Sequence, residues 1–411
     1  MQQDLDSLMN ENKIDAILIT GPAFYNPTMV YMTGGGHVTH ADLIKKVGEP
    51  AILFHGAMER DEAAKSGLKT ISFSNYPVQE LFKEANNEPL QAYALRYSRM
   101  LKDAGVTKGK IALYGVDEVG EKFAIFNALK QYLPDVEIIG FSPDPIFMQA
   151  MMTKDNKEIE RIRAMGVITT GVVARVADFL TSQQVTDNHL VNQDGSLVTI
   201  GQVKSKINLW LAETGAENPE GTIFAIGRDS GVPHSAGTNT DVLELGKTIV
   251  FDIFPCEAGG GYYYDFTRTW SLGYATEEAQ KLYDQVKEVY QKVEAEFKLD
   301  TPFIDCHIKT CELFEAMGHP TVLSTPETEV GLVHSLGHGV GLHIHESPFS
   351  RAIGGKSDVL AAGSVFTSEP GLYYPERGLG VRIENTYWMR PDGKAEILVD
   401  YPYDFVLKMK S

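Results

Sequence analysis

The sequence predicts an α+β protein of two domains, and three observations support this. The chain has 411 residues, which exceeds one ordinary domain at roughly 100–200 residues each. Its first 150 residues alternate short apolar runs with helical stretches, a pattern typical of an α/β domain. Beyond a boundary near residues 143–153, helices are grouped around a set of strands, as in an α+β domain. We therefore expect one domain at residues 1–150 and a second at residues 151–411.

In the first domain, runs rich in β-branched residues predict strands, and helical periodicity between them predicts helices. The strands are expected at residues 14–20, 51–54, 70–73, 110–114 and 137–140, and the helices near residues 58–66, 78–103 and 118–132. In the second domain, a long amphipathic pattern predicts a helix at residues 154–180. Further helices are expected at residues 201–214, 276–298 and 302–318, and strands at residues 247–254, 261–271, 364–369, 379–389 and 395–399.

The charge balance and the cysteine count limit the partners and the compartment. Lys and Arg total 37 against 55 Asp and Glu, which gives a net charge of −18. Such a chain repels phosphate backbones and lacks a polybasic anchor, so we expect neither a nucleic-acid nor a membrane partner. No apolar run approaches the ~20 residues of a membrane span, and the polar N-terminus does not indicate a secretory signal. Three cysteines, an odd number, are typical of reduced thiols, so we expect a cytoplasmic protein.

Two aspartates lie on strands that are otherwise apolar or aromatic. Asp252 lies within the apolar run at residues 248–254. A buried, unpaired carboxylate costs several kcal/mol, so Asp252 needs a cation or hydrogen bonds. On the returning strand, two-residue alternation places Asp265 on one face with Tyr263 and Thr267. If the two strands form a hairpin, Asp252 and Asp265 share that face. Capped or solvated aspartates are the alternative.

Four of the eleven histidines fall within one short segment. His334, His338, His343 and His345 are interleaved with three glycines, which allow close approach of the backbone. A single histidine usually packs in a core or lies on a surface. A cluster beside glycines favours contact with a ligand or a substrate.

Two glutamates complete an oxygen-rich set. Glu369 ends an apolar strand, and Arg382 shares a strand face with Glu384. Two carboxylates 4 Å apart repel each other by roughly 4 kcal/mol at an effective dielectric constant of 20. Divalent metal ions would reverse the sign of that interaction. Carboxylates with a single imidazole suit Mn²⁺, Fe²⁺ or Co²⁺, with Zn²⁺ as a further candidate.

The order Asp, Asp, His, Glu, Glu and the motifs around these residues resemble the pita-bread metallopeptidase family of methionine aminopeptidase, aminopeptidase P and prolidase. The motifs are residues 265–269, 337–348, 368–371 and 381–385. Residues 1–150 resemble the N-terminal domain of the aminopeptidase P, prolidase and creatinase branch. The resemblance implies an α/β creatinase-like domain followed by a pita-bread catalytic domain. It also implies hydrolysis of Xaa-Pro bonds, in dipeptides or at the N-terminus of peptides.

The resemblance further assigns two divalent metal ions per chain, with Mn²⁺ favoured, and a homodimer or higher homo-oligomer. Asp252 would bind one metal and His338 the other, while Asp265 and Glu384 would bridge both. Glu369 would bind the second metal and act as general base toward a bridging hydroxide.

Four further residues match positions that contact substrate in the proline-specific branch. His234 and His345 would take part in catalysis by stabilising the tetrahedral intermediate, and both would bind substrate together with His334 and Arg382. Packing in the core is the alternative for the histidines, and a structural ion pair is the alternative for Arg382.

Two departures from the family pattern affect the expected pocket. Asp252 and Asp265 are 13 positions apart, more than is usual in the family, and Phe254 stands where a glycine is usual. Cys256 is an even number of residues from Asp252, so on a continuous strand both would point to the same face. The Cys256 thiolate is therefore an alternative metal ligand.

Two other functions compete with the peptidase. A creatinase-like amidinohydrolase has the same fold but lacks the full metal set, and a non-enzymatic binding protein on this fold tends to lose ligands. All five ligand positions are filled here, and metal analysis would discriminate the three functions.

Overall fold

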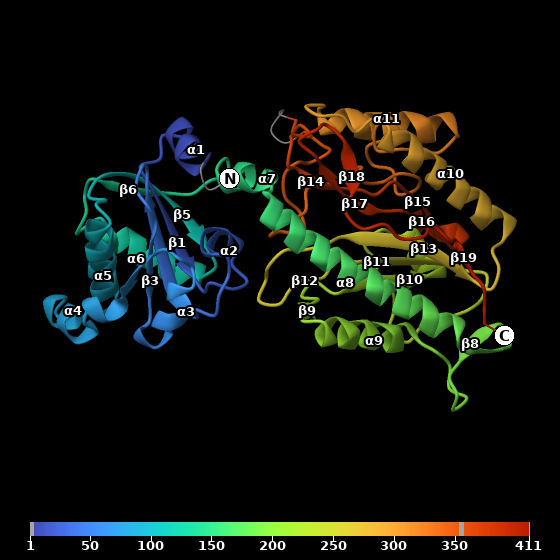
Figure 1. Ribbon diagram of the computed structural model, residues 1–411, viewed down its shortest axis with the longest axis horizontal. Coiled ribbons are helices and arrows are strands. Elements are labelled where there is room, and N and C mark those ends of the chain that lie inside the picture. Colours follow the sequence, from blue (N-terminus) through green and yellow to red (C-terminus); the bar gives the residue numbers. More distant parts are fainter. Residues whose placement is uncertain (1–3, 353–356, 411) are drawn as a thin grey trace. The chain divides into compact units, whose positions relative to one another are not determined.

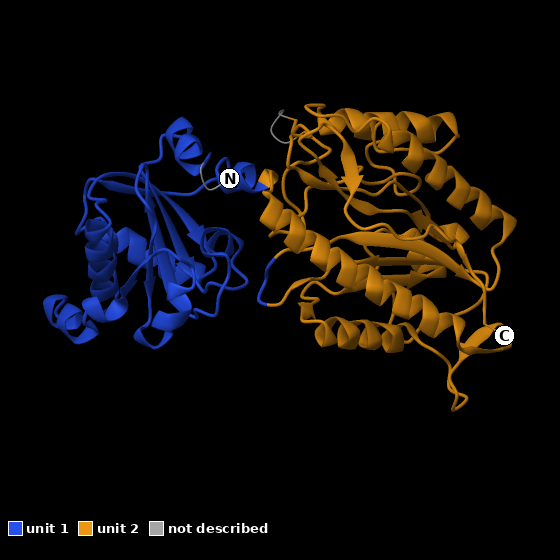
Figure 2. Ribbon diagram, viewed as in Figure 1, with its two compact units in different colours: residues 1–151, 259–261 blue, residues 152–258, 262–411 orange. Residues whose placement is uncertain are grey.

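The computed structural model describes residues 4–352 and 357–410, and the chain divides into two compact units (Figure 2). Unit 1 comprises residues 1–151 and 259–261, and unit 2 comprises residues 152–258 and 262–411. Each unit is described by itself.

Unit 1 is built on a six-stranded mixed sheet in the order β4-β3-β2-β1-β5-β6 (Figure 1). The central strand β1 runs parallel to β5 and antiparallel to β2, and all six of its residues are buried. The strands are β1 (Ala16–Gly21), β2 (Ala41–Lys46), β3 (Ile52–His55), β4 (Lys69–Ser72), β5 (Gly109–Gly115) and β6 (Val136–Ile139). The helices are α1 (Leu5–Glu11), α2 (Pro27–Thr33), α3 (Arg60–Ala64), α4 (Val78–Glu84), α5 (Pro89–Asp103), α6 (Val119–Leu129) and α7 (Phe147–Met152).

The helix predicted at residues 78–103 is two helices, α4 and α5. Asn86 and Asn87 between them have φ angles of 53° and 62°, and Pro89 begins α5. Asparagine tolerates the left-handed region and proline cannot continue a preceding helix, so the chain turns at this point. Strand β2, which was not predicted, contains Asp42, Lys45 and Lys46 among its apolar residues, and these polar side chains hide the strand pattern.

Unit 2 places its β-sheets between two pairs of helices (Figure 1). Helix α8 (Asn156–Thr181) packs along α9 (Ile200–Glu213), and α10 (Glu277–Glu294) packs along α11 (Phe303–Ala316). Asp155 caps the first turn of α8 in a capping box with Glu158, which is why the helix begins there. All four helices were predicted from the sequence.

The strands of unit 2 form a four-stranded sheet in the order β10-β11-β13-β19, a three-stranded sheet β14-β17-β18, and the pairs β15-β16, β12-β9 and β7-β8. Their bounds are β7 (Gln184–Thr186), β8 (His189–Val191), β9 (Ala216–Glu217), β10 (Thr222–Ile226), β11 (Thr248–Ile253), β12 (Cys256–Glu257), β13 (Phe266–Leu272), β14 (Val365–Ser368), β15 (Gly371–Tyr374), β16 (Leu379–Arg382), β17 (Asn385–Met389), β18 (Ala395–Ile397) and β19 (Val406–Leu407). The strand predicted at residues 379–389 is divided into β16 and β17, which lie in different sheets.

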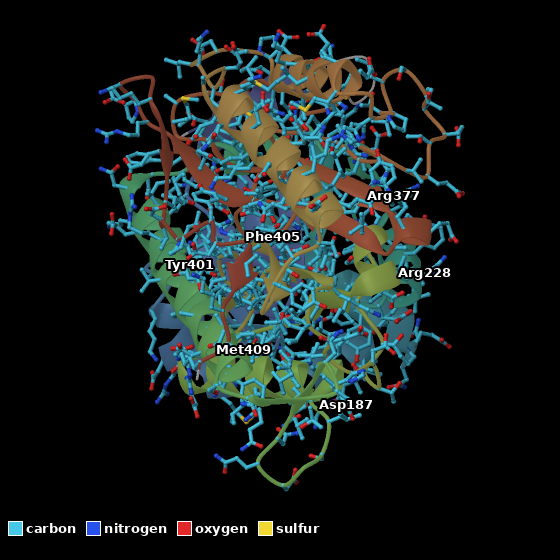
Figure 3. The ribbon with its side chains drawn as sticks, turned by 90° about the vertical axis from the view of Figure 1, so that its right-hand side faces the viewer. Asp187, Arg228, Arg377, Tyr401, Phe405 and Met409 are labelled. Carbon is cyan, nitrogen blue, oxygen red and sulfur yellow. The ribbon has the colours of Figure 1, made fainter. Side chains whose placement is uncertain are left out.

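The C-terminal segment, in which Figure 3 labels Tyr401, Phe405 and Met409, packs against the rest of unit 2 through a buried arginine, Arg268. Arg268 of β13 is 1% exposed and donates hydrogen bonds to the carbonyls of Tyr401 and Pro402. Phe405 stacks on Tyr283 of α10 with ring centroids 4.4 Å apart, and β19 pairs with the end of β13. The same arginine donates to the Glu384 carbonyl, so it ties this segment to the turn that carries Glu384.

Helix α8 is long and apolar enough to cross a membrane by length and composition alone, with a mean hydropathy of 1.4 over an 18-residue window. Half of that window is buried inside the protein, as is usual for a helix that covers a sheet.

Candidate metal centre

The pairing of β11 with β13 brings the two aspartates to one face. Asp252 pairs with Thr267, and Asp265 lies two residues before Thr267, just before β13 begins. Residues two apart on an extended chain point the same way, so Asp265 and Thr267 share the face of Asp252. Both aspartates are buried, with exposed fractions of 8% and 5%.

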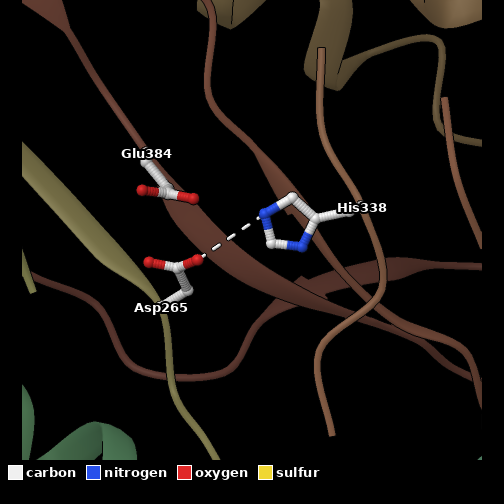
Figure 4. A group of neighbouring side chains, drawn as sticks. All are labelled: Asp265, His338 and Glu384. Carbon is white, nitrogen blue, oxygen red and sulfur yellow. Dashed lines mark ion pairs between the residues drawn. The ribbon is translucent and has the colours of Figure 1, made fainter. Parts of the chain in front are cut away.

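Asp265, His338 and Glu384 form a compact group of potential ligands (Figure 4). One ligand atom of each lies within 4.8 Å of the others, and all three residues are buried. His338 Nε2 is 3.6 Å from Asp265 Oδ2. The three residues come from distant parts of the sequence. Glu384 reaches Asp265 because the turn between β16 and β17 is hydrogen-bonded to β13, where the Glu384 N–H donates to the Thr267 carbonyl.

Glu369 joins this group through His338. Its Oε1 lies 3.3 Å from His338 Nε2, and its backbone N–H donates to the Leu336 carbonyl. The residue directly follows β14, where the chain leaves the sheet. Its carboxylate therefore faces the same histidine as Asp265.

Three carboxylate oxygens in this place have no hydrogen-bond partner among the described residues. They are Asp252 Oδ1, Asp265 Oδ1 and Glu384 Oε1, and all are buried. An unsatisfied buried oxygen is costly, and more so when it carries charge. Cations would satisfy all three, so the donor set fits divalent metal ions with oxygen ligands.

Burial and the neighbouring charges shift the pKa values of these residues. Burial raises the pKa of Asp265 and of Glu384 well above their usual values, and the charges of Asp252 and Asp265 respectively add to the effect. Burial would also raise the pKa of Glu369, but hydrogen bonding to His338 outweighs it and brings the value to about 2. Burial opposes the protonation of His338, yet Glu369 and Asp265 raise its pKa to about 9. These shifts show that the carboxylates and His338 lie close enough together to interact strongly.

Asp252 is held differently from the other carboxylates. It is outside the compact group and accepts a hydrogen bond from Arg382 Nη2 at 2.5 Å. Burial raises its pKa, while the charge of Arg382 opposes that shift. Arg382 was predicted beside Glu384 on one strand face, but the structure pairs it with Asp252 because Glu384 lies in the turn after β16.

All five potential ligands line one cavity of about 1190 Å³, together with the three histidines predicted to contact substrate. The rings of His345 and His338 lie 4.3 Å apart, and burial lowers the pKa of His345 to about 4. His334 Nε2 is 2.9 Å from the Tyr373 hydroxyl. His234 follows the short helix Gly227–Gly231 and is exposed toward the cavity.

Sequence reasoning missed the hydroxyl groups that orient these side chains. The Thr267 hydroxyl donates to Glu384 Oε2 at 2.6 Å, and the Tyr373 hydroxyl accepts from Arg382 Nη1 at 2.7 Å. The sequence could have indicated Thr267 as a site residue, because it lies two positions from Asp265 on one predicted strand and so shares its face. No local sequence pattern indicates that Tyr373 belongs to the site. Cys256 lies in β12 rather than at the cavity, and burial raises the pKa of its thiol to about 11, which does not favour a thiolate ligand.

Comparisons with known proteins agree with this arrangement. Residues 160–391 match metallopeptidase family M24. The chain is 26% identical over 394 residues to a Xaa-Pro dipeptidase of Pyrococcus horikoshii, covering 95% of this chain and 94% of the relative. It is 27% identical over 406 residues to a Xaa-Pro dipeptidase of Pyrococcus furiosus, covering 97% and 98%.

The solved structure of a Xaa-Pro dipeptidase from Bacillus anthracis is similar over 98% of both chains, with a TM-score of 0.75 at 21% identity. This likeness confirms the predicted fold, an α/β domain followed by a pita-bread domain. Because the family match spans more than half of the residues, the chain belongs to metallopeptidase family M24.

Proposed function

We propose that the chain is a metal-dependent peptidase that hydrolyses the Xaa-Pro bond, in dipeptides or at the N-terminus of longer peptides. One observation carries the proposal: four carboxylates and His338 line a single cavity, and three of their buried oxygens have no hydrogen-bond partner within residues 4–352 and 357–410. The two archaeal relatives named Xaa-Pro dipeptidases, which align over nearly the whole chain, support the choice of substrate.

The cavity would hold two divalent metal ions, with Mn²⁺ favoured over Co²⁺, Fe²⁺ and Zn²⁺ by the oxygen-rich set. Asp252 and His338 would each bind one metal, Asp265 and Glu384 would bridge, and Glu369 would bind the second. When bound, such ions make water more acidic and polarise a carbonyl oxygen.

Glu369 would accept the proton of the attacking water and pass it on to the leaving nitrogen. A general base must be ionised and close to the reacting atoms. A glutamate carboxylate is ionised at neutral pH, and Glu369 lines the cavity with its Oε1 3.3 Å from His338 Nε2.

The remaining polar groups would hold the substrate. His345 and His234 would donate to the oxygen that becomes negative in the tetrahedral intermediate, and His334 would contact the peptide beside Tyr373. Arg382, which is hydrogen-bonded to both Asp252 and Tyr373, would also bind the substrate.

A proline in the second position suits the same cavity. Proline lacks the N–H and fixes φ, so its ring reaches the site with little conformational freedom left to lose. Ile223, Phe254, Val333 and Ile344 give the cavity apolar surface for such a ring.

We further propose domains at residues 1–150 and 151–411, a homodimer or higher homo-oligomer, and a cytoplasmic location. Val116, Val119 and Phe123 of unit 1 are 51%, 79% and 71% exposed, and such neighbouring apolar side chains favour an interface. The three cysteines are free and buried, which is typical of a reducing compartment.

A direct assay tests the proposed activity. Purified protein should hydrolyse Ala-Pro and Ala-Pro-Ala faster than Met-Ala-Ala, lose this activity with a chelator, and regain it with Mn²⁺. Preference for Met-Ala-Ala would reject the proline specificity, and full activity of metal-free protein would reject the metal mechanism.

A further inference from the structure

One wall of the cavity carries two polar side chains that the proposed mechanism does not use. Lys204 and Asn208 lie four residues apart on α9, so they are neighbours on one face of that helix. Both line the cavity that contains the candidate metal ligands.

Lys204 is a cation without a counter-ion. Its Nζ donates to the Ala236 carbonyl at 2.5 Å, and it makes no ion pair within residues 4–352 and 357–410. Burial alone lowers the pKa of its ammonium group, which agrees with the lack of a nearby acid. Glu220 lines the same cavity but does not pair with it.

Asn208 lines the same cavity one helical turn from Lys204. Its Oδ1 accepts a hydrogen bond from Asn218 Nδ2 at 2.9 Å, and Asn218 Nδ2 also donates to Thr222 Oγ1. The Asn208 amide nitrogen donates no hydrogen bond within residues 4–352 and 357–410, so it is available to a ligand. An ammonium and an amide donor on one helix face form a pair that suits a carboxylate.

The sheet fixes how far this pair lies from the reacting centre. Ile223 of β10 pairs with Asp252, and the next residue, Phe224, donates its N–H to the Ala236 carbonyl that Lys204 contacts. Ala236 is therefore two strand spacings from β11, about 10 Å. A peptide extends at most ~3.3–3.6 Å per residue, so the C-terminal carboxylate of a dipeptide lies nearer to the scissile carbonyl than the C-terminus of a tripeptide or the side-chain carboxylate of an N-terminal Glu.

We propose that Lys204 and Asn208 form a carboxylate-binding subsite that selects peptides carrying a negative charge away from the scissile bond. This rests on the proposed Xaa-Pro hydrolysis and adds the substrate class. The carboxylate has two sources, the side chain of an acidic first residue or the C-terminus of a tripeptide.

Paired substrates separate the two sources. Glu-Pro is compared with Gln-Pro for the side chain, and Ala-Pro-Ala is compared with its C-terminal amide for the terminus. The wild type should prefer the charged member of one pair by about 5–30-fold in kcat/KM. Lys204→Met should reduce that preference to below about 2-fold.

Two variants provide the controls. Lys206→Met removes a cation of the same helix that lies over the rings of Phe179 and Trp210 rather than in the cavity, and its preference should equal that of the wild type. Arg351→Met removes an exposed cation that lines the cavity beside Phe349. Loss of the preference in Arg351→Met but not in Lys204→Met would overturn the proposal, as would equal use of both members of each pair by the wild type.

Hydrolysis of Ala-Pro keeps this proposal separate from the proposed function, because Ala-Pro has neither a side-chain carboxylate nor a third residue. If the protein hydrolyses no Xaa-Pro peptide, calorimetric titration of both substrate pairs into wild type and Lys204→Met still decides. Tighter binding of the charged member of one pair by the wild type alone supports the subsite, and equal binding within both pairs rejects it.

Discussion

Arg382 Nη2 donates to Asp252 Oδ2 at 2.5 Å, while Asp252 Oδ1 is buried and has no hydrogen-bond partner in the part of the chain that the structure describes. The guanidinium is 2% exposed and also donates to the Tyr373 hydroxyl and to Thr267 Oγ1. One oxygen of Asp252 is thus neutralised by the protein, and the other is left for a cation. The arginine balances a cluster of four carboxylates that would otherwise repel one another.

Arg382→Met should destabilise the metal-free protein more than the metal-loaded protein. Removing one member of a buried ion pair leaves an uncompensated charge, at a cost of about 3–5 kcal/mol. Bound metal ions would offset part of that charge. Urea unfolding with EDTA and with Mn²⁺ measures both free energies.

Arg382→Lys is the matched control for this variant. A lysine keeps the charge but cannot place two forked donors on Asp252 and Tyr373, so its loss of stability should be intermediate. An equal loss for Arg382→Met with and without metal would contradict the link between Arg382 and the metal site.

Asp265→Ala should lose bound metal and activity together. Asp265 lies with His338 and Glu384 within 4.8 Å, so it contributes to the place where the ligands are closest. Metal content by mass spectrometry after dialysis should fall to less than half of the wild-type value. Asp178→Ala, which removes an exposed partner of Lys410, should keep its metal, and retention of metal by Asp265→Ala would exclude Asp265 as a ligand.

The sequence allowed the fold and the shared face of the two aspartates to be predicted because both depend on local patterns. Asp252 inside an apolar strand and Asp265 on a returning strand implied a shared face, and the register Asp252–Thr267 explains it. The pairing of Arg382 with Asp252 could not be predicted, because it depends on where the chain turns between β16 and β17. Strand parity alone placed Arg382 beside Glu384.

The ion pair of Lys154 is a second contact that could not be predicted from the local sequence. The sequence predicts Lys154 as the first residue of an amphipathic helix, but the structure places it just before α8, 6% exposed and paired with Glu346. The two residues are 192 positions apart, so no local pattern connects them. Glu346 also accepts the backbone N–H of His343, in the loop that carries His345.

Lys154→Met should destabilise the protein by about 3–5 kcal/mol, because it leaves Glu346 as a buried charge without a partner. The double variant Lys154→Met, Glu346→Gln removes that charge and should recover much of the loss. Thermal unfolding of the two variants and the wild type measures the difference. A single variant as stable as the wild type would show that the pair is not coupled.

His307 should make the protein less stable in acid. Burial lowers its pKa from 6.5 to about 4, so between these values the unfolded chain binds a proton that the folded chain does not. Stability therefore falls as pH falls from 6.5 to 4, by on the order of 3 kcal/mol, and this contribution is constant outside that window.

His307→Gln should flatten the decrease in stability across that window, and urea unfolding at intervals between pH 4 and 7 measures it. His40→Gln, a change at an exposed histidine, should keep the wild-type slope. Equal slopes for all three proteins would show that His307 is not the group that titrates.

The turnover of Glu369→Gln, measured together with its metal content, tests the central claim most directly. Gln keeps one oxygen for a metal but cannot accept a proton, so the account predicts that most of the metal remains. It also predicts that kcat for Ala-Pro falls by about 10²–10⁴, the range for loss of a general base. That decrease corresponds to roughly 2.7–5.4 kcal/mol. Wild-type kcat in a metal-loaded Glu369→Gln protein would contradict the account.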